Sequence, residues 1–195
     1  MMNAILLAGG KSTRFKKNKA IAEYNGQRLI EHTSNLLNKH FDQVYLVVDS
    51  KEKYSFIKNC KIVEDIIPNK GPVGGIYTGL MASNRKYNYI MACDMPLMSG
   101  RFIEYIKNWE QNYDVLLPEY NGYIEPLAGI YSKKCLPVIE KNLRNGNLSI
   151  RDFLKEVKMQ SIDESLIKRN FSNKNIFYNI NYQKDLEQLN TVNGG

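Results

Sequence analysis

The sequence predicts an α/β fold in which helices cover both faces of a mostly parallel sheet. Short apolar stretches typical of buried strands alternate with stretches of helical periodicity, and glycine or aspartate follows several of the strands. Strands that alternate with helices are joined by right-handed crossovers, which place helices on both faces of the sheet. Ligands of such sheets bind beyond the carboxyl ends of the strands.

The first half of the chain contains the most regular alternation. Strands are expected at 3–8, 43–49, 61–64 and 88–93, and helices at 28–39 and 73–83. Gly9-Gly10, Asp65 and Asp94 directly follow three of these strands. Because the carboxyl ends of parallel strands share one edge of the sheet, we expect these residues to converge on one crevice.

The second half continues the pattern less regularly. We expect helices at 101–110, 133–143, 149–157 and 182–189, strands at 113–117 and 175–180, and an extended stretch at 124–131. No linker rich in Pro, Gly or Ser divides the chain. At about 150 residues per domain, the length predicts a single domain spanning residues 1–195.

Composition places the chain among ordinary globular proteins. Of its 195 residues, 43% are hydrophobic and 24% are charged, and the net charge of +7 suggests an anionic partner. No apolar run approaches the ~20 residues that a bilayer span requires, and no signal sequence begins the chain. The cysteines are widely spaced, which indicates a reducing compartment. We therefore expect a soluble, cytoplasmic protein without a membrane partner.

The loop after the first strand carries the most informative charge pattern. Gly9-Gly10 is followed by five cations and no acid within nine residues: Lys11, Arg14, Lys16, Lys17 and Lys19. Paired glycines allow backbone N–H groups to approach an anion closely, and a cationic rim suits a polyphosphate. A solvated basic loop with a glycine turn is the alternative interpretation.

Two other phosphate-binding motifs are excluded. Gly10-Lys11-Ser12 imitates the end of a Walker A loop, but that motif requires glycine where this chain has Ile5. The dinucleotide motif G-x-G-x-x-G is also absent, which excludes the usual nicotinamide and flavin enzymes.

Ordered blocks along the chain resemble one known family. They are LAGGKSTRF at 7–15 with Lys19-Ala20, Glu64-Asp65, GPVGGIYTGL at 71–80, ACDMP at 92–96, EPLAGIYS at 125–132 and NINYQKDL at 179–186. Their order and spread resemble molybdenum cofactor guanylyltransferase of the nucleotidyltransferase superfamily. The resemblance implies a three-layer, Rossmann-like nucleotidyltransferase domain. It implies transfer of GMP from GTP to the terminal phosphate of molybdopterin, with release of pyrophosphate.

The resemblance also implies catalytic residues. Asp94 would be the metal ligand, holding Mg²⁺ with Mn²⁺ as a substitute, and a single carboxylate suits a cation that takes its other ligands from phosphate and water. Lys19 and Arg14 would neutralise charge on the phosphates. Asn18 and Phe15 depart from the acidic residue and methionine that are common in the family, so phosphate contacts beyond Lys19 and Arg14 stay open.

The implied nucleotide-binding residues are Leu7, Ala8, Gly9, Lys19, Asp65, Gly74, Asp94 and Asn181. Leu7, Ala8 and Gly9 would act mainly through their backbone. A turn cap is the alternative role for Asp65, a plain helix start for the Gly71–Gly75 turn, and a helix cap for Asn181 in the Asn179-x-Asn181 motif. Glu125 and Pro126 would border the pterin.

Rival functions remain at this stage. A sibling nucleotidyltransferase would use CTP on molybdopterin or another NTP on a sugar or polyol phosphate, and a regulator of the same fold would bind nucleotide without catalysis. A nucleic-acid-binding protein is disfavoured, because its cations would spread over a face with interleaved aromatic residues. GTP and molybdopterin are the expected substrates, with molybdoenzyme-maturation proteins as further partners. His32 and His40 are expected on the surface without a chemical role.

Overall fold

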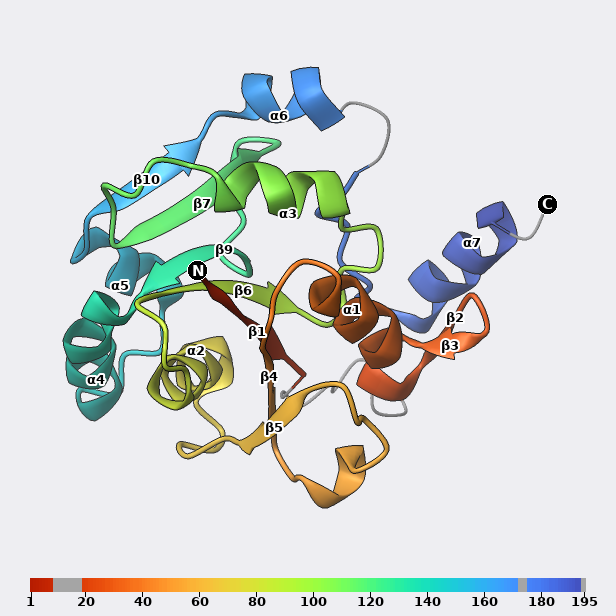
Figure 1. The fold of residues 1–195 in the computed structure, drawn as a ribbon, viewed down its shortest axis with the longest axis horizontal. Helices are drawn as coiled ribbons and strands as arrows, with labels where there is room; N and C mark the ends of the chain where they lie inside the picture. The colour runs from red at the N-terminus through yellow and green to blue at the C-terminus, as the bar shows by residue number, and fades with distance from the viewer. Residues whose placement is uncertain (9–18, 172–174, 194–195) are drawn as a thin grey trace.

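The protein, seen in a computed structural model that describes residues 1–8, 19–171 and 175–193, is built on one large sheet (Figure 1). The strand order is β10-β7-β9-β6-β1-β4-β5, and β8 pairs with β7 outside this path. The strands are β1 (Asn3–Leu7), β4 (Val44–Val48), β5 (Lys61–Glu64), β6 (Tyr87–Ala92), β7 (Val115–Tyr120), β8 (Tyr123–Ile124), β9 (Ala128–Ser132) and β10 (Met159–Ile162). A separate antiparallel hairpin contains β2 (Glu23–Tyr24) and β3 (Gln27–Arg28).

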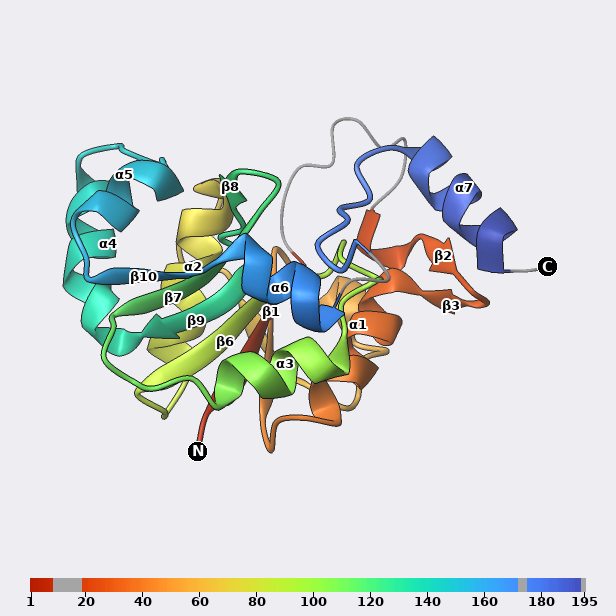
Figure 2. The same ribbon diagram turned by 90° about the horizontal axis from the view of Figure 1, so that it is seen from above.

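Helices cover both faces of the sheet, so the expected three-layer architecture is confirmed (Figure 2). The helices are α1 (Leu29–Asn38), α2 (Gly71–Ala82), α3 (Gly100–Lys107), α4 (Leu136–Arg144), α5 (Ile150–Lys155), α6 (Glu164–Phe171) and α7 (Gln183–Asn193), with short 3-10 helices η1 (Lys19–Ile21), η2 (Glu52–Tyr54) and η3 (Lys133–Cys135). No helix within these described ranges combines the length and apolar character needed to cross a membrane.

Strand β1 shows why the sheet has a core on each face. All five of its residues are buried, and successive side chains point to opposite faces. Ala4 and Leu6 pack with α1, α3 and α6, whereas Ile5 and Leu7 pack with α2, α4 and α5. A strand that must bury both faces has to be wholly apolar, as the sequence indicated.

The sheet is mostly parallel, as predicted, with one interruption. β1 pairs in parallel with β4 and β6, β4 with β5, and β7 with β10. β9 lies between β6 and β7 and runs antiparallel to both. The stretch expected to be extended over 124–131 is therefore divided between β8 and β9 by a short loop.

The strand expected at 175–180 is wrong. This segment turns, with the N–H of Tyr178 donating to the carbonyl of Asn175 at 3.0 Å, and it forms no strand. Its apolar side chains are buried elsewhere, because Phe177 packs edge-on against Phe102 of α3 and Ile180 joins an apolar cluster under α7. The apolar pattern correctly indicated that these residues are buried, but they pack against helices and not within the sheet. β10 escaped prediction because three of its four residues are exposed.

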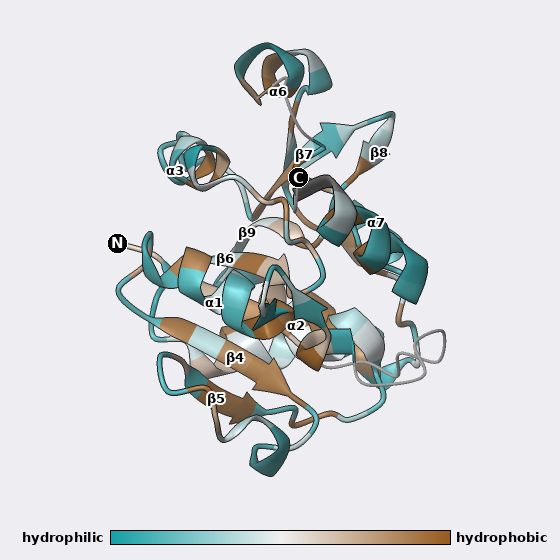
Figure 3. Ribbon diagram, turned by 90° about the vertical axis from the view of Figure 1, so that its right-hand side faces the viewer, coloured by the Kyte–Doolittle hydropathy of each residue, from teal (hydrophilic) through white to brown (hydrophobic). Residues whose placement is uncertain are grey.

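Helix α7 lies beside the β2–β3 hairpin, away from the two main cores (Figures 1 and 3). Tyr24, Leu29, Ile180 and Leu186 form a small buried cluster beneath it. Figure 3 shows that β4 and β5 are largely apolar while α7 is largely hydrophilic, as expected for one buried face on an otherwise exposed helix. The cluster packs the segment before α7 against the hairpin and the start of α1.

Candidate functional site

Asp94 lies directly beyond the end of β6, and its backbone is fixed from two sides. The N–H of Cys93 donates to the carbonyl of Leu7 at 3.0 Å, which ties this turn to the end of β1. The N–H of Ile180 donates to the carbonyl of Asp94 at 3.0 Å. Segments distant in sequence therefore meet at Asp94, as the strand-end position predicted.

The Asp94 carboxylate has one paired and one unpaired oxygen. Oδ2 forms an ion pair with Lys19 Nζ at 2.6 Å, and only 14% of the Lys19 side chain and 22% of the Asp94 side chain are exposed. Oδ1 is buried and has no hydrogen-bond partner among the described residues. Burying a carboxylate oxygen without a hydrogen-bond partner costs free energy, so this oxygen is a candidate ligand for a bound cation. The structure thus brings together two predicted catalytic residues.

Cys93 packs beneath Asp94, as expected, and its thiol is unreactive. Burial, with a smaller contribution from the negative charge of Asp94, raises the pKa of its thiol to about 12. The thiolate that nucleophilic catalysis or metal binding requires is therefore absent at neutral pH.

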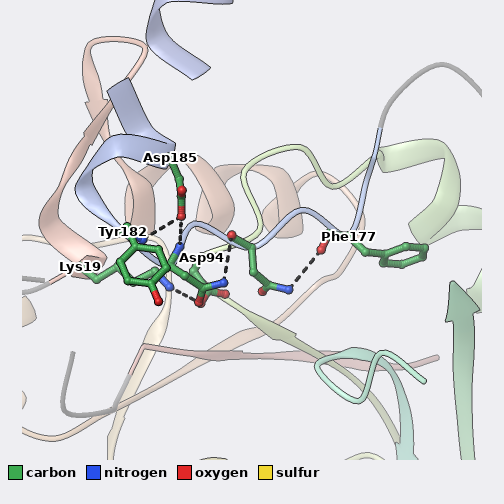
Figure 4. A network of polar contacts seen from close by, with 7 residues as sticks. Lys19, Asp94, Phe177, Tyr182 and Asp185 are labelled. Carbon is green, nitrogen blue, oxygen red and sulfur yellow. Dashed lines mark hydrogen bonds and ion pairs between the residues drawn. The ribbon is translucent and has the colours of Figure 1, made fainter. Parts of the chain in front are cut away.

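The Asn179–Asn181 segment runs past Asp94 into α7 (Figure 4). The Asn181 side chain donates to the Asn179 carbonyl at 3.4 Å, and the Asn179 side chain donates to the Phe177 carbonyl at 3.1 Å. The backbone N–H groups of Asn181 and Tyr182 both donate to Asp185 Oδ2 at 2.8 Å. Asp185, in the first turn of α7, therefore fixes the backbone just before the helix, and the capping alternative for Asn181 stays a prediction.

Asp65 lies on the same edge of the sheet but in a separate cluster. Strands β1 and β4 separate its strand from that of Asp94, which corresponds to about 14 Å between strand axes. Asp65 Oδ1 accepts hydrogen bonds from the Ile67 N–H at 3.1 Å and the Thr78 hydroxyl at 2.7 Å. Asp65 therefore caps the turn that follows β5, as the alternative interpretation expected.

Gly74 packs against the Asp65 cluster at the start of α2. A Cβ at this position would lie 2.9 Å from Lys70 Cβ and 3.1 Å from the Ile67 carbonyl oxygen. The close approach of this loop to the helix therefore requires glycine. Asp65 and Gly74 are neighbours, as one nucleotide subsite would need. The described residues of the expected crevice thus form two clusters, one around Asp65 and one around Asp94.

The remaining predicted residues belong to the first loop. Leu7 and Ala8 are buried, and their backbone groups already have internal partners: the Leu7 carbonyl accepts from Cys93, and the Ala8 N–H donates to the Val47 carbonyl at 3.0 Å. Gly9 and Arg14 lie outside the described residues, as do Lys11, Lys16 and Lys17.

Glu125 occupies a loop whose backbone is held at three consecutive residues. Its N–H donates to the Pro118 carbonyl at 2.9 Å, the Tyr131 hydroxyl donates to the Pro126 carbonyl at 2.7 Å, and the Leu127 carbonyl accepts from Ala92 at 3.1 Å. Burial, and then the charge of Asp94, raise the pKa of Glu125 to about 7. Sequence reasoning named Glu125 only through the family resemblance, and its electrostatic coupling to Asp94 has no sequence signal.

His32 also contributes to the site, which sequence reasoning missed. Its side chain is only partly exposed. Its Nε2 bonds the Pro96 carbonyl at 3.0 Å and its Nδ1 bonds Gln27 Nε2 at 3.0 Å. A carbonyl only accepts, so Nε2 carries the proton. His32 thereby ties α1 to the segment after Asp94. His40, likewise half-buried, pairs with Glu104 at 2.7 Å.

A divalent cation fits the Asp94 cluster. The buried, unpartnered Oδ1 supplies one hard oxygen ligand. Within the described ranges, no group of three or more His, Cys, Asp or Glu side chains could enclose a metal ion. The arrangement suits a cation that takes most of its ligands from phosphate and water, and it does not suit a closed zinc site.

The comparisons with known proteins agree with this geometry. Residues 4–162 match the family described as MobA-like NTP transferase domain. A probable molybdenum cofactor guanylyltransferase from Carboxydothermus hydrogenoformans is 35% identical, covering 96% of this chain and 94% of that protein, and one from Peptoclostridium acidaminophilum is 32% identical, covering 97% and 89%. The crystal structure of molybdopterin-guanine dinucleotide biosynthesis protein A from Archaeoglobus fulgidus shares the fold, with a TM-score of 0.87, 22% identity and 99% of each chain covered. The chain therefore belongs to the family of MobA-like NTP transferase domains.

Proposed function

We propose that this protein transfers GMP from GTP to the terminal phosphate of molybdopterin and releases pyrophosphate. The observation that carries the proposal is the Lys19–Asp94 pair at the end of β6, with a second carboxylate oxygen left open. An acidic and a basic group at one strand edge suit a reaction between two anionic reactants. The full-length similarity to proteins named molybdenum cofactor guanylyltransferase supports the choice of substrates.

Asp94 would hold the divalent cation, which we propose is Mg²⁺, with Mn²⁺ as a substitute. The cation would offset charge on the α-phosphate and the leaving pyrophosphate. Lys19 and Arg14 would bind phosphate oxygens, and a fixed ammonium group stabilises charge most where it accumulates in the transition state. We assign Asn181 to the α-phosphate side, because its neighbour Ile180 is bonded to the Asp94 backbone.

Nucleotide recognition would involve the Asp65 cluster and the end of β1. Leu7, Ala8 and Gly9 would contact the nucleotide with their backbone, while the Leu7 carbonyl and the Ala8 N–H keep their internal partners. Gly74 would allow the nucleotide to approach α2 closely. Asp65 Oδ1 is occupied by two internal hydrogen bonds, so its other oxygen, Oδ2, would accept from the sugar or base. Glu125 and Pro126 would face the acceptor.

We further propose that residues 1–195 act as one catalytic domain in the cytoplasm, with molybdoenzyme-maturation proteins as partners and without nucleic acid. The three cysteines form no disulfide bond, and two of them, Cys93 and Cys135, are buried. A reducing compartment is the ordinary location of such a chain.

The test is pyrophosphate release measured with GTP, CTP, ATP and UTP, each with and without molybdopterin. We expect release with GTP alone among the four nucleotides, and only when molybdopterin is present. Equal release with CTP would assign the protein to a cytidylyltransferase. Release with a sugar phosphate in place of molybdopterin would reject the proposed acceptor.

A further inference from the structure

The ion pair between Lys19 and Asp94 differs from the other ion pairs of the described residues. It alone has both side chains less than a quarter exposed; the Lys155–Asp152 pair on α5, for example, has 69% and 46% exposed. Exposed pairs are screened by water and contribute little, whereas a pair this buried is held strongly in place. The ammonium group of Lys19 thus neutralises Asp94 within the protein itself.

The position of Lys19 Nζ conflicts with a cation bound to Asp94 alone. Nζ lies 2.6 Å from Oδ2, so a divalent ion on the same carboxylate would be only a few ångströms from a positive charge. Repulsion at that separation amounts to several kcal/mol even at an effective dielectric constant of about 20. The Lys19 backbone is fixed, because its carbonyl accepts from the Ala22 N–H at 3.1 Å and Ala20 beside it is buried.

We propose that Lys19 is a built-in counter-ion, which disfavours cation binding at Asp94 until a triphosphate arrives. Phosphate oxygens would then give the ammonium group a new partner and leave the carboxylate to the cation. Cation and nucleotide would therefore bind as a cooperative pair. This inference rests on the proposed assignment of Asp94 to the cation and Lys19 to phosphate.

The proposal predicts opposite effects of one substitution on two ligands. Lys19→Ala removes the competing charge, so Mn²⁺ without nucleotide should bind on the order of tenfold more tightly than to the wild type. The same variant should bind a non-hydrolysable GTP analogue more weakly. In the variant no ammonium group has to leave Asp94, so the analogue should enhance Mn²⁺ binding less than it does in the wild type. Because coupling between two ligands is reciprocal, Mn²⁺ should likewise enhance binding of the analogue less.

The experiment is a titration of free Mn²⁺ followed by electron paramagnetic resonance, with and without the analogue. Lys155→Ala removes the lysine of a surface pair, Lys155–Asp152 at 2.8 Å, and serves as a matched control expected to bind Mn²⁺ as the wild type does. In the presence of the analogue, Asp94→Asn should lose tight Mn²⁺ binding, and in the Lys19→Ala background it should remove the gain seen with Mn²⁺ alone.

The outcomes separate this inference from the proposed function. If Lys19→Ala binds Mn²⁺ alone no more tightly than the wild type while Asp94→Asn loses it, the counter-ion role is wrong and the metal assignment stands. If Asp94→Asn keeps full Mn²⁺ affinity, the metal assignment and this inference both fail. Thermal melting is a second readout: Mg²⁺ alone should raise the melting temperature of Lys19→Ala more than that of the wild type. An equal increase would contradict the proposal.

Discussion

Asp65 and Asp94 occupy equivalent places in the sheet, each just beyond a parallel strand, but their carboxylates have different partners. Asp65 Oδ1 has two internal donors, Ile67 and Thr78, and closes the turn into α2. Asp94 has one ionic partner and one buried oxygen with no partner in the described part of the chain. The buried Oδ1 without a partner is the reason that we assign the cation to Asp94 and not to Asp65, so position at a strand end alone does not identify a catalytic acid.

Substitution of Asp94 should have the largest effect on turnover. Asp94→Ala removes the only carboxylate that we assign to the cation, and it should reduce turnover on the order of a thousandfold, as the loss of a key electrostatic group does. Circular dichroism should show an unchanged fold. Near-normal pyrophosphate release at saturating Mg²⁺ would refute the assignment.

The partner of Asp94 should come second. Lys19→Ala should reduce kcat/KM for GTP by about 10- to 100-fold, equivalent to the loss of a charge-assisted hydrogen bond of roughly 1.5–3 kcal/mol. Lys16→Ala and Lys17→Ala should have much smaller effects. Equal effects from all three substitutions would indicate a diffuse basic patch in place of a defined phosphate contact.

The satisfied carboxylate should affect folding more than chemistry. Asp65→Ala leaves the Ile67 N–H and the Thr78 hydroxyl without their partner, which should lower the free energy of unfolding by about 1–3 kcal/mol. A double-mutant cycle with Thr78→Val, followed by urea denaturation, isolates the shared hydrogen bond. Additive effects of the two substitutions would show that this bond contributes no stability.

The smallest effect concerns Glu125 and depends on pH. Its pKa is raised from 4.5 to about 7, so the folded state disfavours its charged form, and stability should fall as pH rises through that interval. Glu125→Gln removes this penalty. The variant should be more stable than the wild type by about 1–2 kcal/mol at pH 8, discounted for a half-exposed group, and by almost nothing at pH 4.

Urea denaturation of both proteins at pH 4 and pH 8 measures the Glu125 effect, and Glu119→Gln on β7 is a control from the same hairpin. A stability difference that is independent of pH would show that neither burial nor the charge of Asp94 penalises the Glu125 charge.

The fold was largely predictable because its central strands are buried on both faces. β1, β4 and β6 are wholly buried and were recognised by their continuous apolar runs. β10 was missed because it is mostly exposed, and the segment around Phe177 and Ile180 was misassigned because apolar residues there pack on helices. Apolar runs indicate burial, but they do not identify the neighbouring element.

The strand-end positions of two proposed site residues were predictable from the sequence, but the separation between them was not. Strand ends predicted Asp65 and Asp94 correctly as edge residues, but strand order determines that two strands separate them. The hydrogen bond of His32 to Pro96 depends on a tertiary contact with no local pattern. The roles of Gly9 and Arg14 stay predictions, because they lie outside the described residues.

The most direct test of the account compares Asp94→Asn with Asp65→Asn, two substitutions of equal size and charge change. Mn²⁺ affinity in the presence of a non-hydrolysable GTP analogue is the quantity to measure. The account predicts that Asp94→Asn weakens Mn²⁺ binding at least about a hundredfold, whereas Asp65→Asn leaves it within a few-fold of the wild type once nucleotide is saturating. Equal losses in both variants would contradict the claim that only the unsatisfied carboxylate holds the cation.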